Sequence, residues 1–176
     1  MIFAPLPIEG AFTIDLEPRH DERGFFARTW CRREMEEQGL DATLAQESLS
    51  YNAKAGTLRG MHYVRPPHGE TKLVHCRRGV LFDVMVDLRP DSPTHLRWHG
   101  TVLSAENRTS VYIPAGVAHG FLTLADDTEI VYRISDFHRP DAEAGFRWDD
   151  AVFAIDWPGP VHLVSPRDAA WPPFRP

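Results

Sequence analysis

The clearest pattern along the chain is the two-residue alternation over residues 80–88, which is typical of a β-strand. The even-numbered positions carry Val, Phe or Leu, and we expect this face to lie in a core. The other face carries Asp83, whose carboxylate must meet either water or a cation. Residues 89–93, Arg-Pro-Asp-Ser-Pro, have the composition of a turn that ends this strand.

Shorter apolar runs follow at intervals of roughly ten residues, separated by Gly, Pro, Asn and Asp. They cover residues 101–103, 110–113, 119–124 and 129–135. Many short strands at this spacing predict an all-β sandwich or barrel. One moderate helix is expected over residues 29–40, where Cys31 and Met35 share a face and Gly39 is a stop signal.

The length of 176 residues suits one domain over residues 1–176, because no repeat, linker or break in composition divides the chain. No run of about 18 apolar residues is present, so we expect no membrane span. The first residues lack the features of a signal peptide, and a cytoplasmic location is the expectation. The net charge of −6 argues against a nucleic-acid partner, and a small anionic ligand would need a local cluster of cations.

Groups that could carry chemistry are concentrated in residues 56–79, GTLRGMHYVRPPHGETKLVHCRRG. This stretch places Arg59, His62 and Lys72 on two strand-like runs joined by a Pro-rich loop. Burying such groups is costly unless they have a partner or a purpose. We therefore interpret this stretch as the floor of an active site.

A second motif, Pro-Ala-Gly-Val-Ala-His-Gly-Phe at residues 114–121, puts His119 near the start of a strand after a tight turn. It resembles the second signature of the cupin jelly rolls, where the His can be a metal ligand. The first cupin signature normally brings a His-x-His pair, which this chain lacks. A metal-binding or ligand-sensing cupin with His62, His68 and His119 as ligands therefore stays open as one alternative.

Motifs over nearly the whole chain resemble, in order, the dTDP-4-dehydrorhamnose 3,5-epimerase family. They lie at residues 56–63, 72–74, 82–84, 87–93, 103–107, 113–121, 147–150 and 165–168. The resemblance implies a cupin-type jelly-roll barrel with one or a few short helices, a homodimer, and no metal or other cofactor. It also implies a nucleotide diphosphate sugar as substrate, with conversion of dTDP-4-dehydro-6-deoxyglucose to dTDP-4-dehydrorhamnose as the expected reaction.

The chemistry of such a substrate explains why these residue types occur together. A ketone at C4 acidifies the protons on C3 and C5, so inversion needs a base, an acid on the opposite face and a cation beside the enolate. The resemblance assigns His62 as the base, Asp168 as its carboxylate partner, Tyr132 as the acid and Lys72 as the cation. Read by itself, Tyr132 could equally be a core residue of an alternating strand.

Binding of the nucleotide sugar is assigned by the same resemblance to seven positions. They are Arg23, Arg28, Gln46, Arg59, His119, Glu143 and Arg167. Arg23, Arg59 and Arg167 are expected to form the cation cluster that a diphosphate needs.

Three departures from the family pattern bear on the substrate and on the product. Arg28 stands where the family usually has a Glu. The segment from Gln46 to Arg59 is one residue longer than in typical members, and Ser48 stands where an Asn is usual. Phe137-His138 replaces a pair that often ends in Tyr. These departures leave GDP, CDP and UDP open beside dTDP, and they leave open which of C3 and C5 is inverted. A ketoisomerase on the same scaffold, which moves the carbonyl between C3 and C4, is a second alternative.

Overall fold

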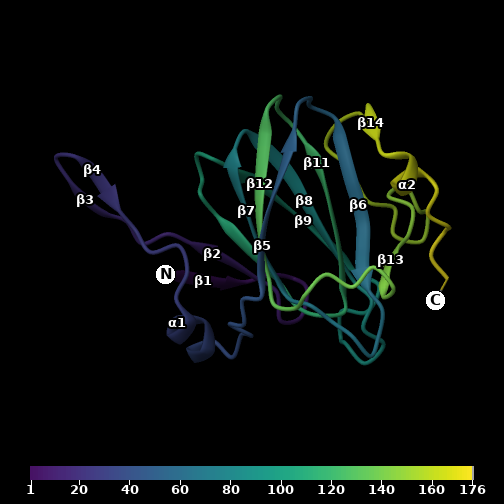
Figure 1. The fold of residues 1–176 in the computed structure, drawn as a ribbon, viewed down its shortest axis with the longest axis horizontal. Helices are drawn as coiled ribbons and strands as arrows, with labels where there is room; N and C mark the ends of the chain where they lie inside the picture. The colour runs from purple at the N-terminus through teal and green to yellow at the C-terminus, as the bar shows by residue number, and fades with distance from the viewer. Residues whose placement is uncertain (176) are drawn as a thin grey trace.

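The computed structural model describes residues 1–175, and most of its strands form two six-stranded, largely antiparallel sheets (Figure 1). The first sheet contains, in spatial order, β1 (Ile2–Pro5), β2 (Phe12–Asp15), β10 (Ser110–Ile113), β7 (Lys72–Arg78), β12 (Thr128–Ile134) and β5 (Gln46–Asn52). The second contains β13 (Glu143–Gly145), β6 (Thr57–Val64), β11 (Val117–Thr123), β8 (Val80–Asp87) and β9 (Trp98–Ser104), with β14 (Leu163–Val164) beside β6. The predicted all-β, cupin-type jelly roll is confirmed.

Strand β8 shows how the apolar residues are divided between two cores. Leu81 and Met85 lie between the two sheets, in a cluster that includes residues of both. Val84 and Val86 lie on the other face of β8, against Phe146 and other residues of the C-terminal segment. The alternation predicted the strand correctly, and its even-numbered face lies in a core as expected. The C-terminal segment covers the outer face, so both faces of β8 are buried.

The outer face of the first sheet is covered by the N-terminal part of the chain. Helix α1 (Arg32–Glu37) contributes Met35, which packs with Leu73 and Tyr112. The helix is shorter than the predicted 29–40 because Cys31 is still extended, with φ −151°. Gly39 ends the helical region with φ +72°, a conformation that glycine adopts without strain.

A hairpin of β3 (Arg19–Asp21) and β4 (Gly24–Phe26) forms a separate two-stranded sheet. Figure 1 shows it extending away from the barrel. The short helix α2 (Pro166–Ala169) follows β14 and lies near β6. Within residues 1–175, no helix is long and apolar enough to cross a membrane. A single domain over the whole chain stays a prediction.

An irregularity between β6 and β11 decides which side chains enter the barrel. His62 lies opposite His119, whereas Arg59 lies opposite Phe121. Two residues of β6 therefore face the single residue Gly120, which makes this a β-bulge. Residues three apart point to opposite faces of a regular strand. With the extra residue, Arg59 and His62 instead line the same cavity.

Glycine is required at this bulge. Gly60 has φ +132°, and a Cβ added there would lie 2.6 Å from the Cα of Gly120. The two backbones approach so closely that a side chain at residue 60 would force them apart.

Candidate active site

Three cavities adjoin at His62, and we call them together the cleft. The first, of about 240 Å³, is lined by Ser50, Arg59, His62, Lys72, His119, Gly120, Phe121 and Tyr132. The second, of about 130 Å³, is lined by His62, Tyr63, Val64, Glu70, Lys72, His138, Arg139 and Glu143. The third, of about 410 Å³, lies between β6 and the segment from β14 to α2, beside Arg59, Arg167 and Asp168. The cleft therefore collects most of the residues that the sequence analysis singled out.

His62 and Asp168 form a close pair although they lie far apart in the sequence. The ring Nε2 of His62 is 2.6 Å from Oδ1 of Asp168. The Gly60 N–H donates to Oδ2 of the same carboxylate at 3.4 Å. The backbone of Asp168 is fixed in turn by Ser165, whose Oγ accepts from the Asp168 N–H at 3.0 Å and caps helix α2. The carboxylate is thus held in one place against the imidazole.

The protonation state of Asp168 follows from these contacts. Burial by itself would raise the pKa of this carboxyl, but the hydrogen bond and the charge of His62 outweigh it. The Gly60 N–H and Trp171 act in the same direction, and the pKa of Asp168 falls below its ordinary value. Asp168 is therefore a carboxylate at neutral pH and can hold a proton on the Nε2 of His62.

Four basic side chains of the cleft each meet a carboxylate. The pairs are His62 with Asp168 at 2.6 Å, His119 with Asp83 at 2.7 Å, Lys72 with Glu70 at 2.6 Å and Arg167 with Glu143 at 2.7 Å. Pairing of this kind offsets the cost of burying charge and holds long side chains in one geometry.

Arg59 is the exception among these cations. Its Nε donates to Oδ1 of Asn52 at 2.9 Å, and its Nη2 donates to the carbonyl of Tyr51 at 3.3 Å. Both partners are neutral, and within residues 1–175 no carboxylate lies within 4.0 Å of this guanidinium. Arg59 therefore keeps a positive charge that a negatively charged ligand can neutralise.

Tyr132 reaches the first cavity from β12, in the sheet opposite to that of His62. Burial and the negative charge of Asp83 raise the pKa of this phenol. A hydrogen bond with Ser50 and the charge of Arg59 lower it by less. The phenol therefore stays protonated at neutral pH and can donate its proton.

The remaining predicted binding residues are divided between the cleft and the N-terminal hairpin. Gln46 lies at the start of β5, and its Oε1 accepts from the backbone N–H of His138 at 2.6 Å, at the edge of the second cavity. Arg23 lies on the turn of the β3–β4 hairpin and pairs with Asp21 at 2.6 Å, with its side chain 84% exposed. Gln46 is thus near the cleft, whereas Arg23 is not one of the residues that line it.

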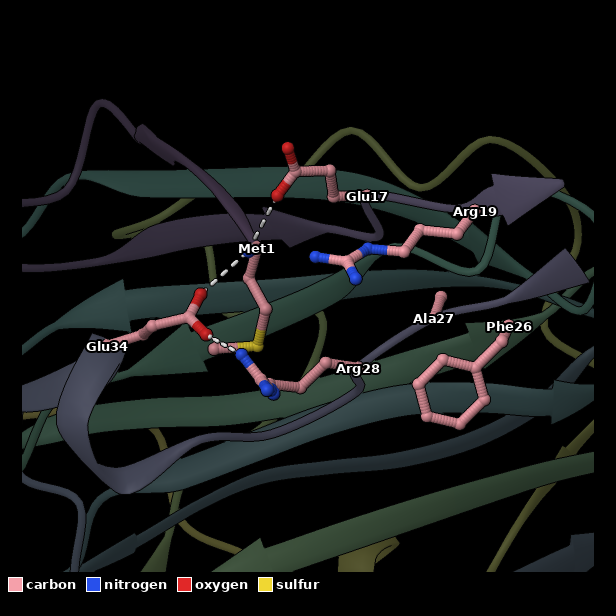
Figure 2. Close-up of a pocket in the computed structure, with 7 residues that line it drawn as sticks. All are labelled: Met1, Glu17, Arg19, Phe26, Ala27, Arg28 and Glu34. Atoms are coloured by element: carbon pink, nitrogen blue, oxygen red, sulfur yellow. Dashed lines mark hydrogen bonds and ion pairs between the residues drawn. The ribbon is translucent and has the colours of Figure 1, made fainter.

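Arg28 also lies outside the cleft. Its Nη1 is 2.6 Å from Oε1 of Glu34, whose other oxygen lies 2.7 Å from the amino group of Met1 (Figure 2). The expected cluster of Arg23, Arg59 and Arg167 is therefore not assembled within one chain. The physical reason is that the β3–β4 hairpin pairs with itself and not with a strand of the barrel.

Three residues of the cleft region were not assigned a role from the sequence. Glu70 pairs with Lys72, and Asp83, which the alternation places on a predicted strand, pairs with His119. Trp171 packs edge-on against His62, with ring centroids 6.4 Å apart, and Arg167 lies over its indole at 5.5 Å from the ring centroid. The position of Trp171 in a Pro-rich tail does not predict its contact with His62.

The arrangement of the histidines also bears on the metal-binding alternative. His62 and His119 each bond a carboxylate, and His68 lines none of the three cavities. Over residues 1–175, no three or more His, Cys, Asp or Glu side chains come together as a set of possible metal ligands. Of the histidine set of that alternative, His62 and His119 share the first cavity, whereas His68 does not line it.

Comparison with known proteins gives the family. The sequence model of the dTDP-4-dehydrorhamnose 3,5-epimerase family matches residues 5–176. The chain belongs to this family. The dTDP-4-dehydrorhamnose 3,5-epimerase of Methanothermobacter thermautotrophicus is 40% identical over 177 residues, which cover 98% of this chain and 94% of that protein. The dTDP-4-dehydrorhamnose 3-epimerase of Streptomyces niveus is 42% identical over 170 residues, with coverage of 96% and 81%.

Solved structures of the epimerase family agree with the sequence relatives. The dTDP-4-dehydrorhamnose 3,5-epimerase from Elizabethkingia anophelis superposes with a TM-score of 0.96 at 33% identity and covers 99% of this chain and 96% of its own. The enzyme of the same name from Bacillus anthracis, solved with TDP and PPi bound, gives 0.94 at 35% identity, with coverage of 98% and 99%. The resemblance inferred from the sequence motifs is confirmed.

Proposed function

We propose that the protein is an isomerase that epimerises a dTDP-linked 4-keto-6-deoxyhexose at C3, at C5 or at both. Family membership over nearly the whole chain supports the reaction class and the substrate class. The observation that carries the proposal is that His62 and Tyr132 line one cavity from opposite sheets and that Lys72 lines the same cavity. A base and an acid on opposite faces of a sugar ring are what inversion requires.

His62 is the proposed base. Asp168 keeps the proton of the imidazole on Nε2, so the lone pair of Nδ1 is available for the proton on C3 or C5 of the sugar. As the C–H bond breaks, its electron pair moves into the ring and the C4 carbonyl becomes an enolate. The carboxylate of Asp168 then stabilises the imidazolium that His62 has become.

Tyr132 and Lys72 complete the proposed reaction. The ammonium group of Lys72 offsets the negative charge that develops on the C4 oxygen. The phenol of Tyr132 then gives its proton to the same carbon from the opposite face, and the carbonyl reforms. The raised pKa of Tyr132 supports this role, because the group enters the reaction in its protonated form.

Arg59 and Arg167 are the proposed contacts to the diphosphate, since both line the third cavity beside the dyad. Arg59 has no carboxylate partner within residues 1–175, and Arg167 is held by Glu143. His119 lines the first cavity, and Gln46 lies at the edge of the second. These four residues and Glu143 are proposed to bind the substrate.

Arg23 and Arg28 do not line the cleft of their own chain. We therefore propose a homodimer in which the β3–β4 hairpin of each protomer reaches the cleft of its partner. Phe26 is the last residue of β4, and its side chain is 77% exposed, which is consistent with such a contact. A cytoplasmic location stays a prediction.

The decisive experiment follows deuterium from the solvent into the sugar. The protein is incubated with dTDP-4-dehydro-6-deoxyglucose in deuterium oxide, and the sugar is analysed by NMR. We expect deuterium at C3, C5 or both, and we expect His62→Ala to abolish that exchange while dTDP still binds. Unchanged exchange in the variant would exclude His62 as the base.

The same spectra separate the other functions. A ketoisomerase would give a product with the carbonyl at C3, which has a different carbon spectrum. A metal-dependent cupin would lose its activity after treatment with a chelator, whereas the proposed mechanism predicts full activity. Thermal shifts with dTDP, GDP, CDP and UDP identify the nucleotide, because a tightly bound ligand raises the melting temperature.

A further inference from the structure

Lys72 and Glu70 form an ion pair in the cleft, and the carboxylate of Glu70 takes no part in the proposed reaction. Lys72 Nζ lies 2.6 Å from Oε1 of Glu70, and the two side chains are only 14% and 15% exposed. Lys72 lines both the first and the second cavity, whereas Glu70 lines only the second. Lys72 therefore lies at the boundary of the two cavities, and the Glu70 carboxylate reaches its ammonium group from the side of the second cavity.

We propose that Glu70 is a positioning residue, which fixes the Lys72 ammonium group beside the C4 oxygen of the substrate. The proposal rests on the function proposed above. A lysine side chain has four rotatable bonds, and its ammonium group has no preferred direction of its own. A cation that stabilises an enolate is effective only if it is in place before the charge develops.

Without Glu70, the fold would fix the backbone of Lys72 but not the ammonium end of its side chain. Residue 72 is the first residue of β7 and lies in register with Ile113 of β10 and Ile134 of β12. These neighbours on both sides determine where its Cα lies. Glu70, two residues earlier in the loop before β7, fixes the other end of the side chain.

The pair also leaves the ammonium group able to act. An ammonium group has three N–H donors, and the carboxylate contact occupies one side of it. The other donors can reach the substrate oxygen. Without a counter-ion, a mostly buried ammonium group in the empty cleft would be costly, because burial removes its water.

A double-mutant cycle tests this assignment. The variants are Glu70→Gln, Lys72→Met and the double substitution, each assayed for kcat and for dTDP affinity. We expect Glu70→Gln to lower kcat roughly 10- to 100-fold with dTDP affinity unchanged, because a displaced catalytic group costs rate and not nucleotide binding. Once Lys72 is absent, the Glu70 substitution should cost no further rate, so the two effects are not additive.

A matched control removes the carboxylate of an exposed pair. Asp126 lies 3.0 Å from Lys54, with side chains 54% and 73% exposed, and Asp126→Asn should leave kcat unchanged. Glu70→Asp keeps the charge on a shorter side chain and should recover part of the lost rate. Additive effects in the cycle, or an unchanged kcat in Glu70→Gln, would overturn the role of Glu70. Absence of epimerisation by the unsubstituted protein would instead overturn the proposed function.

Discussion

Tyr132 and His62 approach the first cavity from different sheets, so the two proposed proton transfers can be separated by substitution. In Tyr132→Phe, His62 can still remove a proton and return one from the solvent to the same face. We expect deuterium exchange to persist in this variant, while the inverted product falls by about 100-fold or more. The measurement is exchange and inversion in the same NMR sample. Equal loss of exchange and of inversion would mean that Tyr132 is also needed for removal of the proton.

The two cysteines give a prediction that is independent of the reaction. Burial raises the pKa of Cys76 to about 11, although hydrogen bonds from the backbone partly offset this effect. The thiolate is the reactive form of cysteine, so Cys76 should resist alkylation in the folded protein. Cys31 is partly exposed. We expect iodoacetamide at neutral pH to label Cys31 first and Cys76 only after unfolding, as read by peptide mass spectrometry. Equal labelling of both in the folded protein would contradict the structure.

Among the strands, the bulge on β6 is the element on which the site depends. Gly60→Ala places a Cβ 2.6 Å from the Cα of Gly120, at a φ of +132°. We expect a loss of about 2 kcal/mol or more in the free energy of unfolding, together with reduced activity, because Arg59 and His62 flank the bulge. Urea denaturation and the epimerase assay measure the two effects.

Gly159 is the matched control for that substitution. Nothing lies within 4 Å of a Cβ added at this position, and its φ is not in the left-handed range. Gly159→Ala should leave both stability and activity unchanged. If the two glycine variants behave alike, the bulge is not the constraint described here.

The turn after β8 is held by a buried carboxylate and gives a pH dependence. Burial alone would raise the pKa of Asp87, but hydrogen bonds from Arg89, Ser92 and Thr94 outweigh it and lower the pKa. Asp87 therefore binds its proton at a higher pH in the unfolded chain than in the folded chain. The stability due to Asp87 is present above the ordinary carboxyl value of 3.8 and is lost as the pH falls towards the lower folded value.

Asp87→Asn tests this linkage. The variant should be less stable by roughly 3 kcal/mol at neutral pH, and it should lose less further stability on acidification. Urea denaturation at a series of pH values measures both. Asp149→Asn, which breaks a pair with side chains 46% and 36% exposed, should cost about 1 kcal/mol or less. An unchanged acid profile in Asp87→Asn would show that other carboxylates dominate.

For the whole molecule, the position of the hairpin gives a test of the proposed homodimer. Arg23→Ala and His62→Ala should each have low activity as pure proteins. In a mixed dimer, the protomer with intact His62 would receive an intact Arg23 from its partner. After unfolding and refolding together, the mixture should recover roughly a quarter of the wild-type rate, because half of the dimers are mixed and each has one complete site. No recovery would mean that each chain uses its own hairpin.

The sequence predicts structural features that depend on neighbouring residues better than features that depend on contacts between distant parts of the chain. The alternation over residues 80–88 predicted β8, because a strand's own side chains produce that pattern. It did not reveal that residues 146–153 cover the outer face, since that contact joins distant parts of the chain. Likewise, the resemblance assigned roles to Arg59 and His62, but only the register between β6 and β11 explains why both enter one cavity.

The β3–β4 hairpin shows that the same limit applies to contacts between chains. The family resemblance grouped Arg23 with Arg59 and Arg167 by function, and a sequence does not say whether such a group belongs to one chain. The β3–β4 pairing is local and satisfies its own backbone, so the hairpin can leave the barrel. In the proposed homodimer, the position that the hairpin takes up depends on the second chain.

The C-terminal segment that covers the second sheet also carries Asp168, which lies 106 residues after His62. During synthesis on the ribosome, the strands of both sheets up to β12 are therefore complete before the carboxylate that orients the imidazole has been made. A chain interrupted before residue 165 lacks the dyad and leaves the outer face of β8 without part of its cover. Translation of helix α2 thus coincides with completion of the His62–Asp168 pair.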